Sequence, residues 1–166
     1  AVQDLLKDYP NEPVLFNIRG ACYADLGQLD VAVTNYKEAI TIKPDYAKAH
    51  FNLAGSLHDL GQLETAVQSY QKTIEIEPNY AEAYNNLGNV FQELEQGDSA
   101  VQSYKRALEI KPDYVAAQYS LGNTFMELGQ LNKAVKSYKA ALKLKPDFVE
   151  AINNLGITFF KLHQLD

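Results

Sequence analysis

Apolar and polar residues follow a helical pattern along this chain of 166 residues, and the pattern repeats every 34 residues. Each unit holds two runs with apolar residues three and four positions apart, which is typical of amphipathic helices. A turn that reads Leu-Gly-Gln-Leu in three units separates the runs, and a proline closes each unit. Repeats of this length predict helix-turn-helix units that bury their apolar faces by stacking. The pattern therefore predicts an all-α solenoid.

Five prolines set the frame of the repeat: Pro10, Pro44, Pro78, Pro112 and Pro146. We expect one solenoid over 1–166, made of the tail of a preceding repeat with its turn (1–12), four repeats (13–46, 47–80, 81–114 and 115–148) and the first helix of a further repeat (149–166). Three or more stacked units suffice for a stable array, so this solenoid should fold alone. Because it starts with Ala1 inside a repeat, we expect a piece of a longer protein.

Residues at the turns predict where the helices begin and end. N-caps are expected after each proline, with capping boxes at Glu82 and Glu150; the capping residues are Asp45, Asn79, Asp113 and Asp147. A left-handed glycine is expected to end the first helix of three units, at Gly27, Gly61 and Gly129. In the third unit the glycine is displaced to Gly97, which predicts a looser turn.

Small and aromatic residues recur at fixed positions of the repeat and predict the core. Small residues at positions 8 and 20 suggest that the two helices approach closely where these residues meet; they are Gly20, Ala54, Gly88, Gly122 and Gly156, and Ala32, Ala66, Ala100 and Ala134. Tyrosines at position 24 are expected to wedge between units: Tyr36, Tyr70, Tyr104 and Tyr138. Arg19 replaces a core leucine, which suggests imperfect packing or an upstream contact. Cys22 is expected to be a small buried residue.

The repeat resembles the tetratricopeptide repeat (TPR). The pattern aromatic-x-x-Leu-Gly-x-x-aromatic is clearest from Tyr84 to Phe91, followed by Ala100, Tyr104, Ala107 and Pro112. The resemblance covers essentially the whole chain. It implies a right-handed superhelical α-solenoid of antiparallel helix pairs, in which the first helix of each pair lines a concave groove and the second forms most of the convex face.

In this family the groove is lined by positions that are rich in asparagine here. The expected peptide-binding residues are Asn17, Asn52, Asn85, Asn86, Asn89, Ser120, Asn123, Asn153 and Asn154. A carboxamide offers two donors and one acceptor, so such a ladder can pair with an extended peptide backbone. The ladder looks like the one in the TPR arm of O-linked N-acetylglucosamine transferases and their bacterial relatives. The alternative is that asparagine merely fills a wet helix face.

Composition and motifs narrow the functional classes. The net charge of −6 disfavours nucleic acids and anionic membranes, so we expect a protein or peptide partner. The common zinc, phosphate and acyl-transfer motifs are absent from the sequence, so we expect no enzyme, no metal and no cofactor. A lone cysteine and the lack of glycosylation sequons favour a cytoplasmic location.

Charged residues also form a basic run and an acidic series. Residues 130–146 contain five lysines and no acid: Lys133, Lys136, Lys139, Lys143 and Lys145. This run is either a solvated face or a surface that steers an acidic partner or a second copy. Acids recur at position 13, as Asp25, Asp59, Glu93 and Glu127, either as a solvated ridge or as contacts for a basic or amide-rich ligand.

Three functions remain open on this basis. The leading one is a non-catalytic scaffold whose concave groove binds an extended peptide or a partner helix. The second is the substrate-recruiting arm of a larger enzyme such as a glycosyltransferase. The third is a self-assembling module, because the last helix would expose Leu155, Phe159, Leu162 and Leu165 for end-to-end association.

Overall fold

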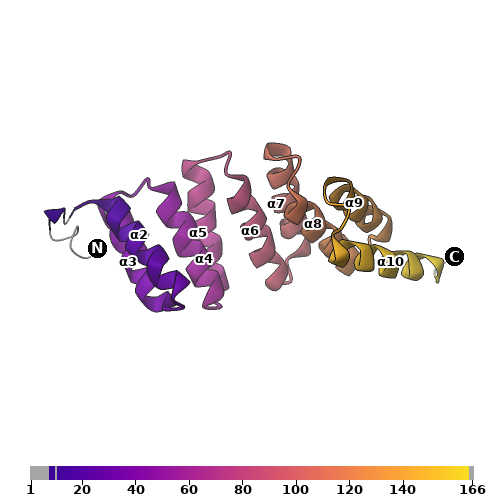
Figure 1. Ribbon diagram of the computed structural model, residues 1–166, viewed down its shortest axis with the longest axis horizontal. Coiled ribbons are helices and arrows are strands. Elements are labelled where there is room, and N and C mark those ends of the chain that lie inside the picture. The colour runs from indigo at the N-terminus through magenta and orange to yellow at the C-terminus, as the bar shows by residue number, and fades with distance from the viewer. Residues whose placement is uncertain (1–7, 10, 165–166) are drawn as a thin grey trace. The chain divides into compact units, whose positions relative to one another are not determined.

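The computed structural model describes residues 8–9 and 11–164, and the regular elements within these ranges are all α-helices (Figure 1). They are α2 (Pro13–Asp25), α3 (Leu29–Ile42), α4 (Ala47–Asp59), α5 (Leu63–Ile76), α6 (Ala81–Glu93), α7 (Gly97–Ile110), α8 (Val115–Glu127), α9 (Leu131–Leu144) and α10 (Val149–His163). The predicted all-α class is therefore confirmed. Most of the predicted tail at 1–12, together with Pro10 and Leu165, lies outside the described residues.

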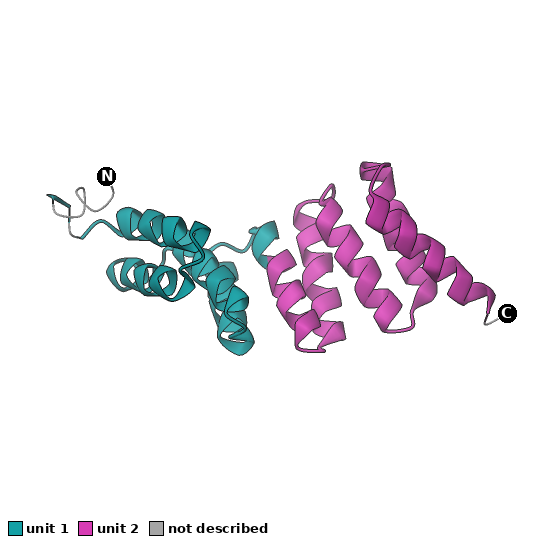
Figure 2. Cartoon of the chain, turned by 60° about the horizontal axis from the view of Figure 1, so that its bottom comes forward, with its two compact units in different colours: residues 1–83 teal, residues 84–166 magenta. Residues whose placement is uncertain are grey.

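The chain forms two compact units, residues 1–83 and residues 84–166 (Figure 2). In unit 1, α2 packs against α3, α4 packs against α5, and α3 also contacts α4. In unit 2, α8 packs against α9, and α9 in turn contacts α10. Below, helix A denotes the first helix of each pair (α2, α4, α6, α8 and α10) and helix B the second (α3, α5, α7 and α9).

The turns between helix A and helix B follow the glycine prediction. Gly27, Gly61 and Gly129 have φ angles of +72°, +71° and +70°, the left-handed conformation that glycine adopts without strain. Glu95 occupies the same place in the third repeat, 81–114, and has a φ of +58°. The prediction of a looser turn there is wrong, because Glu95 adopts the left-handed conformation in place of a glycine.

The predicted aspartate caps are not formed at three helix A termini. The N-cap residues are Tyr46, Tyr114 and Phe148, each without a side-chain capping bond, so the capping box at Glu150 is also wrong. The last residue of the repeat instead serves packing. The Phe148 ring lies 4.8 Å from that of Tyr119, and aromatic contacts of this kind add to the energy of burial.

Buried tyrosines of helix B form the core, as predicted. Tyr104 and Tyr138 are fully buried, and the alanines at position 20 are 0% exposed. The expected contact between small residues is wrong for the glycines. A Cβ placed on Gly88 would lie 2.6 Å from Cε1 of Tyr104, and one on Gly122 would lie as close to Tyr138. Glycine at position 8 thus makes room for the tyrosine ring.

Two residues of α2 differ from their predicted environments. Cys22 is exposed, so the expectation of a buried cysteine is wrong. Arg19 has partners inside its own unit, because its Nε donates a hydrogen bond to Oδ1 of Asn35 on α3 and its guanidinium lies 5.0 Å from the centre of the Phe16 ring. Arg19 therefore replaces the apolar contact of a leucine with a polar one.

Candidate functional site

The predicted binding residues all lie on helix A of their repeats. In unit 1 they are Asn17 on α2 and Asn52 on α4. Nδ2 of Asn52 donates a hydrogen bond to Oδ1 of Asn17 at 2.9 Å, and Asn17 is only 7% exposed. The pair joins position 5 of one repeat to position 6 of the next. Asn17 therefore orients Asn52, which is the more accessible of the two.

In unit 2, α6 carries a second pair of neighbouring carboxamides. Nδ2 of Asn85 donates to Oδ1 of Asn86 at 3.2 Å. Asn85 is 5% exposed, and its buried Oδ1 accepts no hydrogen bond within the described part of the chain. An unsatisfied buried acceptor costs about 1–3 kcal/mol, so this group is a weak point of the local structure. Asn86 is half-buried and is the accessible member.

The asparagines at position 9 are bound to the buried tyrosines. The Tyr104 hydroxyl donates to Oδ1 of Asn89 at 2.8 Å, and the Tyr138 hydroxyl donates to Oδ1 of Asn123 at the same distance. Burial raises the pKa of Tyr104 well above its ordinary value and that of Tyr138 to about 12. Both hydroxyls therefore stay protonated as donors at neutral pH, and they fix the orientation of the two amides.

Asn154 on α10 extends this network. Its Nδ2 donates to Oδ1 of Asn123 at 2.9 Å and to the Tyr119 hydroxyl at 3.1 Å. Asn153 is exposed and Ser120 is half-buried. The structure thus joins Asn123 and Asn154 directly, and it leaves Asn153 at the surface beside them. Tyr119 was not predicted as a site residue, although it holds position 5, where asparagine stands in other repeats.

A small pocket in unit 2 adjoins this surface. It has a volume of about 220 Å³ and is lined by Gln92, Glu95, Gly97, Thr124, Glu127 and Leu128. Nε2 of Gln92 donates to both carboxylate oxygens of Glu127, at 2.9 and 3.0 Å. Glycine at 97 stands where the other repeats have leucine, and this reduction in side-chain volume contributes to the space. Gln92 was missed because the prediction considered only asparagine and serine.

Neither a metal-binding cluster nor a membrane-spanning helix is found among the described residues. No group of three or more His, Cys, Asp or Glu side chains there is arranged to hold a metal ion. No helix in these ranges combines the length and the apolar character needed to cross a membrane.

Family models match most of the chain. A model described as "TPR repeat" matches residues 20–58, 56–95 and 122–162, and one described as "Tetratricopeptide repeat" matches residues 81–114. No curated protein matches the chain. Among solved structures, a crystal structure of MamA is 27% identical over 90% of this chain and 88% of that chain, with a TM-score of 0.84.

Two further solved structures share the fold. MamA 41-end from Desulfovibrio magneticus RS-1 is 20% identical over 91% of this chain and 85% of that one, with a TM-score of 0.85. YrrB, described as a TPR protein with an unusual peptide-binding site, is 18% identical over 98% of this chain and 84% of that one, with a TM-score of 0.84. With its repeated helix pairs and these matches, the chain belongs to the tetratricopeptide repeat family and is a protein-interaction scaffold.

Proposed function

We propose that the helix A surface of each unit, called here the helix-A face, binds an extended peptide or a partner helix without catalysis. The observation that carries this proposal is the pairing of carboxamides between consecutive A helices. Asn52 is held by Asn17 in unit 1, and Asn154 is held by Asn123 in unit 2. Groups fixed in this way lose little side-chain entropy when a ligand binds, which favours affinity.

The remaining hydrogen-bonding capacity of these amides suits a peptide backbone. Asn52 uses one Nδ2 hydrogen for Asn17, so a second hydrogen and its Oδ1 are available to a ligand. Asn154 uses both Nδ2 hydrogens, which leaves its Oδ1 as an acceptor for a peptide N–H. Backbone pairing of this kind does not depend on the side chains of the peptide. The helix-A face is therefore expected to tolerate varied sequences.

A peptide selected from a phage-displayed random library against the chain provides the probe. Fluorescence anisotropy then compares the wild type with the triple variant Asn52→Ala, Asn86→Ala, Asn154→Ala. At about 0.5–1.5 kcal/mol for each hydrogen bond, the triple variant should weaken binding by at least about twofold for a peptide on unit 1, and by at least about fivefold for a peptide on unit 2. The matched control changes three exposed asparagines outside the face, Asn11, Asn79 and Asn132, to alanine. Equal affinity of the wild type and the Asn52 triple variant would reject the face.

A specific observation on α10 favours a second function, end-to-end self-association. Phe159 is 39% exposed and Phe160 is 65% exposed, while Leu155 and Leu162 are half-buried. A Cβ on Gly156 would meet no described atom within 4 Å, whereas Gly122 at the same repeat position meets a tyrosine ring. The apolar face of α10 is thus open to another helix.

Sedimentation velocity over a range of concentrations tests self-association. The wild type should form dimers or larger species as its concentration rises, and the variant Phe159→Ser, Phe160→Ser should remain monomeric. A wild-type chain that stays monomeric at the highest concentration would end this proposal. The variant keeps every asparagine of the helix-A face, and its affinity for the phage-selected peptide shows separately whether peptide binding is retained.

A further inference from the structure

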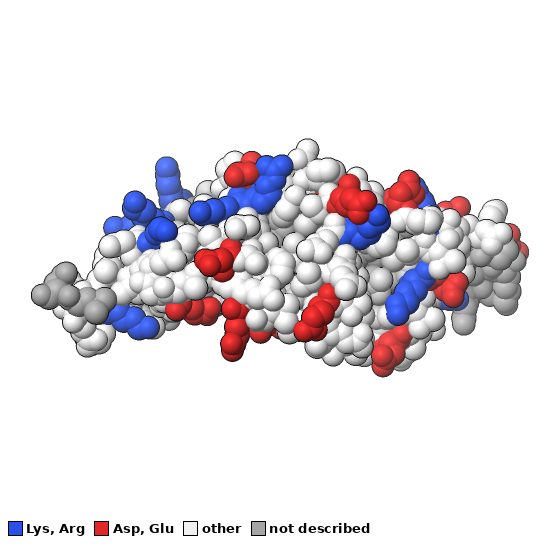
Figure 3. All heavy atoms as spheres, turned by 180° about the vertical axis from the view of Figure 1, so that it is seen from behind, with Lys and Arg blue, Asp and Glu red and all other residues white. Residues whose placement is uncertain are grey.

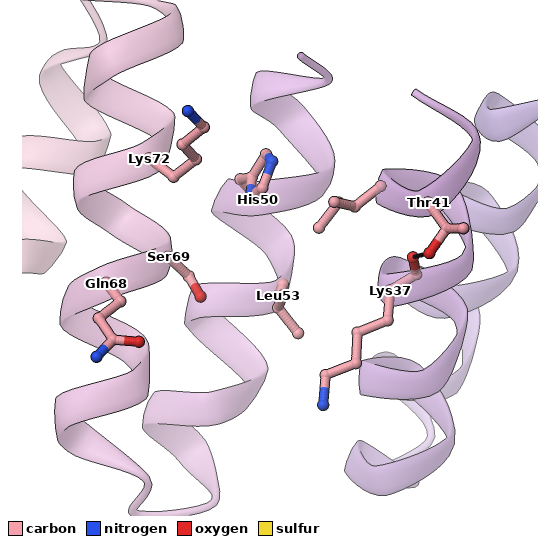
Figure 4. Close-up of a pocket in the computed structure, with 8 residues that line it drawn as sticks. Lys37, Thr41, His50, Leu53, Gln68, Ser69 and Lys72 are labelled. Atoms are coloured by element: carbon pink, nitrogen blue, oxygen red, sulfur yellow. Dashed lines mark hydrogen bonds between the residues drawn. The ribbon is translucent and has the colours of Figure 1, made fainter. Parts of the chain in front are cut away.

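A pocket of about 440 Å³ lies in unit 1, between its two B helices. Residues of α3 and α5 form its walls, and α4 contributes His50 and Leu53. Figure 4 shows Lys37 and Lys72 on helices at either side of the α4 segment that carries these two residues. None of the predicted peptide-binding residues lines this pocket. The pocket is therefore separate from the asparagines of the helix-A face.

The pocket is basic in a chain whose net charge is −6. Its lining includes Lys37, Lys72 and His50 and no acidic residue. Among the described residues, the Lys37 ammonium has no ion-pair partner. Lys72 contacts Glu75 at 2.9 Å, but the two side chains are 44% and 69% exposed. Such surface pairs contribute little, so a bound carboxylate can replace Glu75.

Most neutral polar groups of the pocket already form hydrogen bonds within the chain. The Thr41 hydroxyl donates to the Lys37 carbonyl at 2.8 Å, and the Ser69 hydroxyl donates to the Thr65 carbonyl at 3.0 Å. Their oxygens remain able to accept hydrogen bonds. His50 Nε2 lies 2.9 Å from the Pro44 carbonyl oxygen, which fixes the ring. Donation to an anion therefore rests on the two lysines and on the Gln68 carboxamide.

Apolar side chains complete the lining. Leu53 is buried at 7% exposure, and Ile40 is half-buried. Positive charge thus stands beside an apolar patch and beside hydroxyl oxygens that can accept from a peptide N–H. A free inorganic anion would leave the apolar patch and these acceptors unused. An extended peptide with acidic and apolar side chains would use all three.

We propose that the pocket bounded by Lys37, Lys72, Ile40 and Leu53 binds an acidic segment of a partner protein. In this segment an apolar side chain packs on Ile40 and Leu53, and the flanking carboxylates contact the two ammonium groups. Charge complementarity selects the partner and speeds its association. The scaffold would then hold a second partner segment, independently of any peptide on the helix-A face.

The test uses the chain labelled with nitrogen-15 and the peptide Glu-Glu-Leu-Glu-Glu as the probe. The backbone amide signals of Ile40, Thr41 and Ser69 should shift on titration. The variant Lys37→Gln, Lys72→Gln should weaken binding by about tenfold. Basic side chains also gather near the C-terminal end (Figure 3), where α9 and its C-cap carry five lysines. The matched control Lys136→Gln, Lys143→Gln removes the same charge there and should leave the affinity unchanged.

Four outcomes would overturn the proposal. Equal weakening by the α9 control would mean that the peptide responds to overall charge. Shifts that fall on other residues, or equal shifts with inorganic phosphate alone, would reject a site for an acidic and apolar peptide. Equal binding of Glu-Glu-Gly-Glu-Glu would reject the role of Ile40 and Leu53. If a lysine variant fails to fold, the wild-type shifts and the peptide comparison still decide. The Asn52→Ala variant should bind the acidic peptide normally, so this test and that of the helix-A face can fail separately.

Discussion

Replacing Glu95 by glycine should stabilise the chain, because Glu95 has a φ of +58° at a place where three other repeats use glycine. A left-handed conformation costs a residue with a Cβ about 1–2 kcal/mol. Glycine has greater freedom in the unfolded chain, which offsets about 0.4–1 kcal/mol of that gain. The Glu95 side chain is exposed, so little packing is lost. The expected net gain in the free energy of unfolding is about 0.5–1 kcal/mol.

Urea unfolding followed by circular dichroism measures this gain, and a melting curve should shift upward by about 1–4 °C. Two variants isolate the backbone contribution. Glu95→Ala removes the side chain but keeps the Cβ, so it should give no comparable gain. Gly129→Ala introduces a Cβ at a φ of +70° with no described atom within 4 Å, so it should lose about 1 kcal/mol through the backbone alone. Equal stability of Glu95→Gly and Glu95→Ala would refute the reasoning.

Three further predictions concern the tyrosines and glycines of the core. Tyr104→Ala should lower the free energy of unfolding by about 3–5 kcal/mol, and an unchanged thermal melt would remove Tyr104 from the core. Gly122→Ala should be about 1–3 kcal/mol less stable than Gly156→Ala in urea unfolding. Both variants gain the same helix propensity, but only the first Cβ meets a tyrosine ring, at 2.6 Å; equal stabilities would contradict that contact. Burial raises the pKa of Tyr138 from its ordinary value near 10 to about 12. Between about pH 10 and 12 the unfolded chain therefore loses a proton that the folded chain keeps. The stability that this group contributes is complete below pH 10 and falls across that window. In urea unfolding, the free energy of unfolding of Tyr138→Phe should fall less steeply above pH 10 than that of the wild type. Equal slopes for the two proteins would contradict the raised pKa of Tyr138.

The helices and their turns could be predicted because their signals are local in sequence. Gly27, Gly61 and Gly129 indicate where helix A ends, and the tyrosine at a fixed position of the repeat indicates the core. The predicted cap at Asp147 was wrong because the sequence does not show that the N-cap of α10 is the next residue, Phe148, whose ring contacts Tyr119. Repeat frame and helix type thus follow from the sequence, and the choice among competing side-chain partners does not.

The candidate site shows the same division. The repeat frame places Asn17 and Asn52 on consecutive A helices, but their hydrogen bond depends on the rotamers that the packed helices allow. The fixing of Asn123 by Tyr138 was missed because the tyrosine was considered only as an apolar wedge. The basic pocket of unit 1 was missed for a related reason. Lys72 follows Lys37 by one repeat and one position, so the repeat period could have indicated that the two lysines lie on consecutive B helices.

Side-chain amide spectra of the nitrogen-15-labelled chain, recorded with and without the peptide selected from the phage library, test whether the helix-A face binds peptides. We predict that binding shifts the Nδ2 signal of Asn52 for a peptide on unit 1, or those of Asn86 and Asn154 for a peptide on unit 2. The signals of the control residues Asn11 and Asn132 should not shift. The backbone amide signals of Ile40 and Ser69, in the basic pocket, should stay unchanged with this peptide. A bound peptide that leaves the first three carboxamide signals in place would contradict the account.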